Sequence, residues 1–117
     1  MGSGEPARTN TGTENNADNN NVGNNNETSG FEETLVIQNR RGLHARASAK
    51  FVTTVSEYDA DVRVAKDGIE VSGKSIMGLM MLAAAPGDEI MVRASGPAAG
   101  DAMDALKSLI SDKFGED

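Results

Sequence analysis

Two short alternating segments joined by Asp67-Gly68 constrain the fold of this chain more than any other feature. Apolar residues alternate with charged or polar ones on both sides of the pair, at Val62 and Val64 before it and at Ile69 and Val71 after it. An Asp-Gly pair in this setting is a strong signal for a tight β-hairpin. The sequence therefore predicts two antiparallel strands in the middle of the chain.

Further strands and helices are predicted on both sides of this hairpin. Leu35 and Ile37 alternate with polar neighbours in a strand that starts near Phe31, and a second alternating segment covers 89–94. The helix predicted from Ala45 to about Ser56 has its apolar face at Ala45, Ala49, Val52 and Val55. A short helix capped by Ser75 should run to about Ala84, before Pro86-Gly87. The last helix follows Pro97, with Ala102, Leu106, Leu109 and Ile110 on one face and Gly115 as its stop.

The predicted order is strand, helix, strand, strand, helix, strand, helix. Each element carries one apolar face that must be buried against another element. The simplest architecture that does this is an open-faced sandwich of the α/β (α+β) class: a four-stranded antiparallel sheet with three helices packed on one face.

Composition limits the chain to one small domain with an aliphatic core. The 117 residues include no cysteine, no tryptophan and three phenylalanines. Without cysteine, neither a disulfide-stapled fold nor a thiolate metal site can form. Residues 1–30 are dominated by Asn, Gly, Thr and Glu, and a segment this polar cannot bury enough surface to offset the entropy of ordering it. We expect a disordered Asn-rich tail over 1–30 and a folded domain over 31–117.

Charge and hydropathy exclude several classes of partner. There are 18 acidic and 11 basic residues, for a net charge of −7, and nonspecific nucleic-acid binding needs a basic surface. No apolar run approaches the roughly 20 residues of a membrane span. We expect a cytoplasmic protein whose partners are other proteins, with neither nucleic acid binding nor membrane insertion.

His44, the only histidine, is the candidate reactive residue. It lies where a loop containing Gly42 is predicted to become a helix, so that unpaired backbone N–H groups would face an anion held on its ring. Arg46 adds a planar cation that suits phosphate. Imidazole can attack a phosphoryl group to give a covalent phosphohistidine. The alternative is that His44 is a structural or surface residue. A metal site is poorly supported, because the sequence has no second histidine and no obvious acidic cluster. We expect no cofactor.

Two separated motifs, GLHARASAKF over 42–51 and GKSIMGLMML over 73–82, resemble those of the histidine-containing phosphocarrier proteins (HPr) of the bacterial phosphoenolpyruvate phosphotransferase system. The similarity extends over 31–117. It implies a relay protein rather than an enzyme: His44 would accept a phosphoryl group from phosphorylated Enzyme I and pass it to a IIA-type component. It also implies phosphate contacts from the Arg46 side chain and from the backbone N–H groups of Ala45 and Arg46.

The resemblance also assigns roles to the second motif. Ser75 matches the serine that HPr kinase/phosphorylase modifies in part of the family. The alternative is a purely structural role as a helix cap. Leu79 and Leu82 are expected in the core. Three other apolar residues of the same helix match the patch that family partners bind: Ile76, Met77 and Met80.

Ala47 is a departure from the family pattern, because many members carry proline at that position. Alanine does not fix φ, so the first helical turn is expected to be looser. Variants with alanine there resemble regulatory or nitrogen-linked branches, which leaves both sugar transport and regulation open. Two other classes stay open as alternatives: a regulatory module that docks on kinases or transcription factors, and an RNA-binding sheet, which the acidic balance and the few strand aromatics disfavour.

Overall fold

The computed structural model describes residues 30–116. The predicted tail, apart from Gly30, lies outside the described residues. The helices and strands follow the predicted order, and a short 3-10 helix is added after the last α-helix. Four segments are strands: β1 (Gly30–Val36), β2 (Asp61–Lys66), β3 (Ile69–Ser72) and β4 (Glu89–Ser95). Four are helical: α2 (Ala45–Ser56), α3 (Ile76–Met81), α4 (Ala99–Ser111) and the 3-10 helix η1 (Lys113–Gly115).

The four strands form one antiparallel sheet in the order β1-β4-β2-β3. The predicted hairpin joins β2 to β3, and its turn residues Asp67 and Gly68 have φ values of 52° and 81°. Two consecutive positive φ angles are what a tight hairpin turn with the right twist requires. The predicted hairpin is therefore confirmed.

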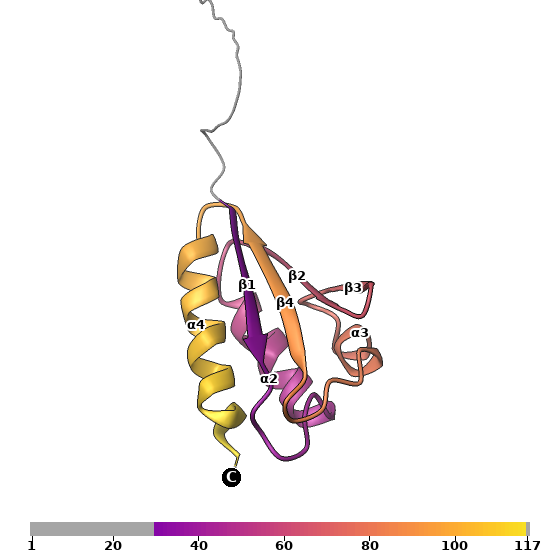
Figure 1. Cartoon of the computed structure of the whole chain (residues 1–117). Coiled ribbons are helices and arrows are strands. Elements are labelled where there is room, and N and C mark those ends of the chain that lie inside the picture. Colours follow the sequence, from indigo (N-terminus) through magenta and orange to yellow (C-terminus); the bar gives the residue numbers. More distant parts are fainter. Residues whose placement is uncertain (1–29, 117) are drawn as a thin grey trace, which may run out of the picture.

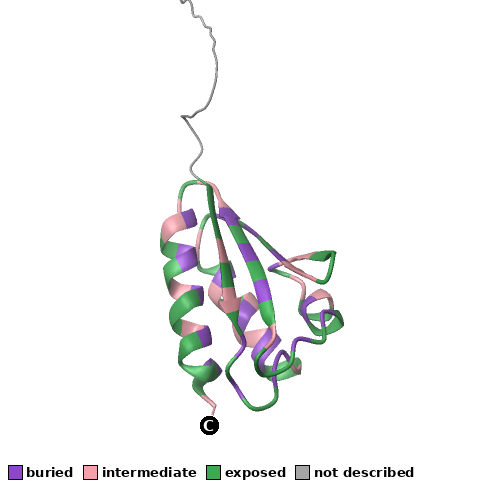
Figure 2. Cartoon of the chain, viewed as in Figure 1, coloured by how far each residue is buried: buried purple, intermediate pink, exposed green. Residues whose placement is uncertain are grey.

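The three α-helices cover one face of this sheet and leave the other uncovered (Figure 1), as predicted. Buried and exposed residues alternate along β4 (Figure 2), because successive side chains of a strand point to opposite faces. The core between sheet and helices is mostly aliphatic, with the fully buried rings of Phe51 and Phe114 among its largest side chains. No helix in residues 30–116 is both long and apolar enough to cross a membrane.

The buried face of α2 differs from the predicted one. The helix has the expected bounds, but its buried residues are Ala47, Ser48, Phe51 and Val55, and only Val55 belongs to the predicted set. Ala45 is exposed in the first turn, while Ala49 and Val52 are half-buried at the edge of the core. The large Phe51 ring dominates the apolar area of this helix, so the helix turns that side chain toward the sheet.

Both later helices end earlier than predicted. α3 stops at Met81, because Ala83 takes a left-handed φ of 53°, a conformation that closes helices. α4 stops at Ser111, and Gly115 instead belongs to η1. The early end of α4 matters for the site, because the segment after this helix turns back toward the loop before α2.

Candidate functional site

His44 occupies the junction between loop and helix that its sequence context predicts. It is the N-cap residue of α2, with extended backbone at φ −74° and ψ −179°, and its carbonyl accepts the first helical hydrogen bond from Ser48 at 2.9 Å. The N–H of Arg46 donates to Nδ1 of the His44 ring at 3.3 Å. The imidazole therefore acts as the capping group at the positive end of the helix dipole.

The loop before His44 is held close to the loop that follows α3. Leu43 is buried, and its N–H donates to the Ala84 carbonyl at 3.0 Å. Gly42 has a φ of 66°, and a Cβ atom placed on it would lie 2.2 Å from that same carbonyl oxygen. Only glycine fits both constraints. Its role is thus set by packing between two loops, which the neighbouring sequence does not reveal.

Glu116, which no sequence motif singled out, binds the other side of the His44 ring. Its Oε2 lies 2.7 Å from Nε2 of His44, and its Oε1 accepts a 3.1 Å hydrogen bond from Nδ2 of Asn39. The same Asn39 amide donates to the Gly42 carbonyl at 2.8 Å. No periodicity or spacing could predict these contacts, because Glu116 lies 72 residues from His44 along the chain.

The two neighbours of the His44 ring select one tautomer. An ionised carboxylate only accepts hydrogen bonds, so Nε2 carries the proton, and Nδ1 must accept from the Arg46 N–H. Burial raises the pKa of Glu116, but hydrogen bonds from Asn39 and His44 and the nearby charge of Arg46 outweigh it, and the pKa lies below its ordinary value. Glu116 is consequently an anion at neutral pH, and the Nδ1 lone pair is left at the helix N-terminus.

Basic side chains surround a pocket of about 350 Å³ next to this ring. The pocket is also lined by Gly115 and Glu116, and its cationic lining comes from Arg40, Arg41, Arg46 and Lys50. Four positive groups against one carboxylate make this region locally positive in a chain whose net charge is −7. Such a setting favours an anion such as a phosphoryl group.

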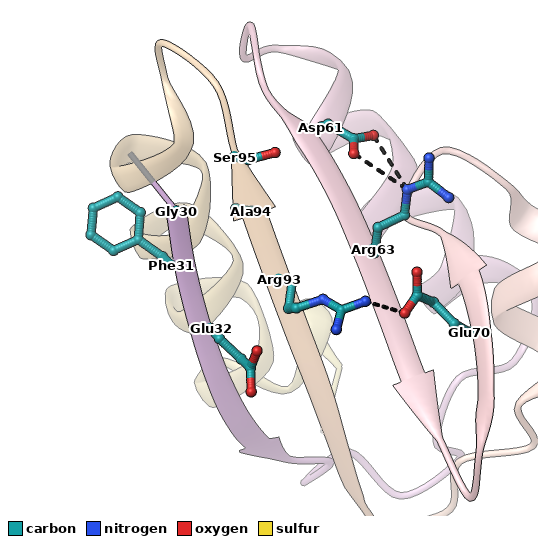
Figure 3. Close-up of a pocket in the computed structure, with 9 residues that line it drawn as sticks. All are labelled: Gly30, Phe31, Glu32, Asp61, Arg63, Glu70, Arg93, Ala94 and Ser95. Carbon is teal, nitrogen blue, oxygen red and sulfur yellow. Dashed lines mark hydrogen bonds and ion pairs between the residues drawn. The ribbon is translucent and has the colours of Figure 1, made fainter. Parts of the chain in front are cut away.

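A larger hollow, of about 530 Å³, lies away from His44 on the uncovered face of the sheet. Its two arginines are already paired with carboxylates: Arg93 reaches across to Glu70, and Arg63 binds Asp61 (Figure 3). Glu32 adds a third carboxylate to this lining, so the hollow carries excess negative charge and does not suit an anionic ligand. We therefore place the candidate site at His44.

The second motif forms a separate surface on α3. Ser75 caps this helix, with its Oγ accepting from the Gly78 N–H at 2.9 Å. Leu79 and Leu82 are buried as expected. The predicted patch is exposed, and Met81, which was not predicted, extends it: Ile76 39%, Met77 71%, Met80 39% and Met81 70%.

Metal-ligating side chains do not gather near the candidate site. Within residues 30–116, no three histidine, aspartate or glutamate side chains lie close enough to hold a metal ion together. The His44 imidazole is a potential nucleophile at a helix N-terminus, with the Glu116 carboxylate on its Nε2 side.

Comparison with known proteins shows which family this chain belongs to. A family model described as "PTS HPr component phosphorylation site" matches residues 31–112. The chain belongs to the HPr family. The phosphocarrier protein HPr of Neisseria meningitidis is 49% identical over 86 residues, covering 74% of this chain and 97% of the relative. HPr of Xylella fastidiosa is 45% identical over 87 residues, covering 74% and 98%.

Solved HPr structures share the fold as well. The crystal structure of an HPr from Thermoanaerobacter tengcongensis matches with a TM-score of 0.71 and 42% identity, covering 74% of this chain and 98% of its own. An HPr from Bacillus anthracis gives 0.67 and 34%, covering 70% and 98%. These matches confirm both the family and the open-faced sandwich predicted from the sequence.

Proposed function

We propose that this chain is a phosphocarrier that accepts a phosphoryl group on Nδ1 of His44 from phosphorylated Enzyme I and passes it to a IIA-type component. The observation that carries the proposal is the state of the His44 ring: Nε2 is engaged by Glu116, and Nδ1 holds its lone pair at the N-terminus of α2. In this role the chain is a substrate in a cytoplasmic relay and forms a covalent phosphohistidine, with no catalytic turnover of its own.

The surroundings of Nδ1 suit a phosphoryl group in both charge and hydrogen bonding. The backbone N–H groups of Ala45 and Arg46 lie in the first turn of the twelve-residue helix α2, where the helix dipole is positive. The Arg46 side chain lines the adjacent basic pocket and can bind phosphate oxygens in a bidentate manner. We infer that these groups neutralise the phosphoryl charge without a metal ion.

Incubation with Enzyme I and phosphoenolpyruvate tests this proposal. We expect a single phosphoryl adduct that is lost in acid, because a phosphorus–nitrogen bond to imidazole is acid-labile. Peptide mapping at alkaline pH should then assign the adduct to His44. An acid-stable adduct, or one mapped to another residue, would contradict the assignment.

The exposed α3 patch, defined by Ile76, Met77, Met80 and Met81, is the proposed docking surface for Enzyme I and IIA-type components. Met77 and Met81 are both 70% exposed or more and share α3 with the exposed Ile76 and Met80, and an exposed apolar patch is typical of a binding surface. Methionine adapts its shape to different partners, and a relay protein must bind a donor and an acceptor in turn. Whether the acceptor serves sugar uptake or a regulatory branch depends on that partner.

Ser75 is the proposed regulatory site, a target for HPr kinase/phosphorylase. Its Oγ caps α3 directly before the patch, so a phosphate would put negative charge beside the docking surface while still suiting the helix N-terminus. We expect Ser75→Asp to fold normally, because aspartate is a good N-cap, and to slow transfer from Enzyme I by roughly tenfold, equal to about 1.4 kcal/mol.

The control for this variant is Ser108→Asp, which makes the same charge change at an exposed position of α4. Stopped-flow or quenched transfer assays with both variants measure the effect. Equal rates for Ser75→Asp, Ser108→Asp and the unmodified chain would remove the support for regulation at Ser75.

A further inference from the structure

The segment after α4 adopts a conformation that brings Glu116 to His44. Lys113, Phe114 and Gly115 have successive φ values of 56°, 57° and 74°. Lys113 and Phe114 are not glycine, so this left-handed turn is strained. Strain of this kind persists only where the surrounding contacts fix the backbone.

Two contacts supply that constraint. The Phe114 ring is fully buried in the core, and its carbonyl accepts a 2.6 Å hydrogen bond from Nζ of Lys50 on α2. The C-terminal segment is thus attached to the same helix that His44 caps. As a result, the Glu116 carboxylate is held at a defined position relative to the imidazole.

Asn39 fixes the carboxylate from the other side. This side chain is fully buried, and its Nδ2 donates both to the Gly42 carbonyl and to Glu116. Its Oδ1 has no hydrogen-bond partner among residues 30–116, which is costly for a buried polar atom. Asparagine at this position is therefore explained by its two donor hydrogens, one of which orients Glu116.

We propose that Glu116 is a positioning residue for phosphoryl transfer, which holds the His44 ring with its proton on Nε2 and its lone pair on Nδ1. This inference rests on the proposed function and extends it to a residue outside both sequence motifs. The 2.7 Å contact between Nε2 and Oε2 fixes the tautomer in the way that a carboxylate behind a catalytic histidine does.

The same contact acts during transfer. As the Nδ1 lone pair forms the new nitrogen–phosphorus bond, the bond between phosphorus and the donor's nitrogen breaks, and its electron pair leaves with the donor. The Nε2 proton stays on the ring, which gains a positive charge. The Arg46 N–H gives up its hydrogen bond to Nδ1 as that lone pair is used. Glu116 balances the new charge across the hydrogen bond it already makes to Nε2.

Three variants test the proposal: Glu116→Ala, Glu116→Gln and, as a matched control, Asp112→Asn. Asp112 is exposed, lies four residues away and makes no side-chain capping hydrogen bond, so its change removes a similar charge without touching His44. The glutamine variant keeps the volume of Glu116 but removes its charge and one of its two acceptor oxygens, and it guards against misfolding of the alanine variant. Circular dichroism checks the fold of all three.

Two readouts are needed, because a purely structural role for Glu116 would not select a tautomer. In ¹⁵N spectra of the neutral His44 ring, the unmodified chain and Asp112→Asn should show the Nε2–H form. Glu116→Ala keeps only the longer 3.3 Å contact from the Arg46 N–H to Nδ1, so it should gain a measurable share of the Nδ1–H form. Phosphoryl transfer from Enzyme I should be about tenfold slower in Glu116→Ala and Glu116→Gln, as expected for the loss of one charge-assisted hydrogen bond.

The outcomes separate this inference from the proposed function. If folded Glu116→Ala and Glu116→Gln accept phosphate at the rate of Asp112→Asn, or if Glu116→Ala keeps the Nε2–H tautomer, Glu116 has no positioning role, although the phosphocarrier function stands. If the unmodified chain takes no phosphate on His44, the proposed function itself fails.

Discussion

Alanine in place of His44 is expected to abolish phosphoryl acceptance while the domain stays folded. His44 carries the only imidazole in the chain, so no other side chain can form the same adduct. The ring also caps α2, and loss of an N-cap costs about 0.5–2 kcal/mol of folding free energy. Labelling with phosphoenolpyruvate and Enzyme I should fall to background, and the thermal midpoint should drop by several degrees.

His44→Asn separates these two effects. Asparagine is a good N-cap but has no nucleophilic ring nitrogen. It should recover much of the capping stability that alanine loses and still accept no phosphate. An acid-labile adduct in either variant would place the phosphoryl group elsewhere and overturn the role of His44.

Gly42→Ala is expected to be the most destabilising small substitution near the site. The residue has a φ of 66°, and the new Cβ would meet the Ala84 carbonyl oxygen at 2.2 Å. The left-handed conformation costs a non-glycine residue roughly 1–2 kcal/mol, and crowding against fixed backbone adds about 1–3 kcal/mol. Urea unfolding should therefore show a loss of roughly 2–5 kcal/mol in the free energy of unfolding.

Gly68→Ala provides the matched control for this prediction. Gly68 has a φ of 81°, but nothing lies within 4 Å of an added Cβ, so only the conformational cost should appear. The difference between the two variants measures the crowding at Ala84. Equal losses would show that the two loops can move apart, and that Gly42 is needed for its φ alone.

Local patterns sufficed for the elements of the fold. The Asp-Gly pair predicted the β2–β3 hairpin because a two-residue turn depends only on its own φ angles. Strand alternation and helical spacing predicted the order of the remaining elements. The buried face of α2 was predicted incorrectly, since weakly apolar alanines leave the face undefined until the Phe51 ring packs against the sheet.

The candidate site divides in the same way. The sequence by itself determined the capping position of Ser75 and singled out His44 and Arg46 as candidates, because each depends on a motif of a few neighbouring residues at a helix start. Only the tertiary structure decided that Asn39 and Glu116 complete the site. Glu116 reaches the His44 ring through a strained turn anchored by the buried Phe114 ring, and Asn39 binds Glu116 rather than the ring. Contacts of this kind depend on packing rather than on sequence spacing.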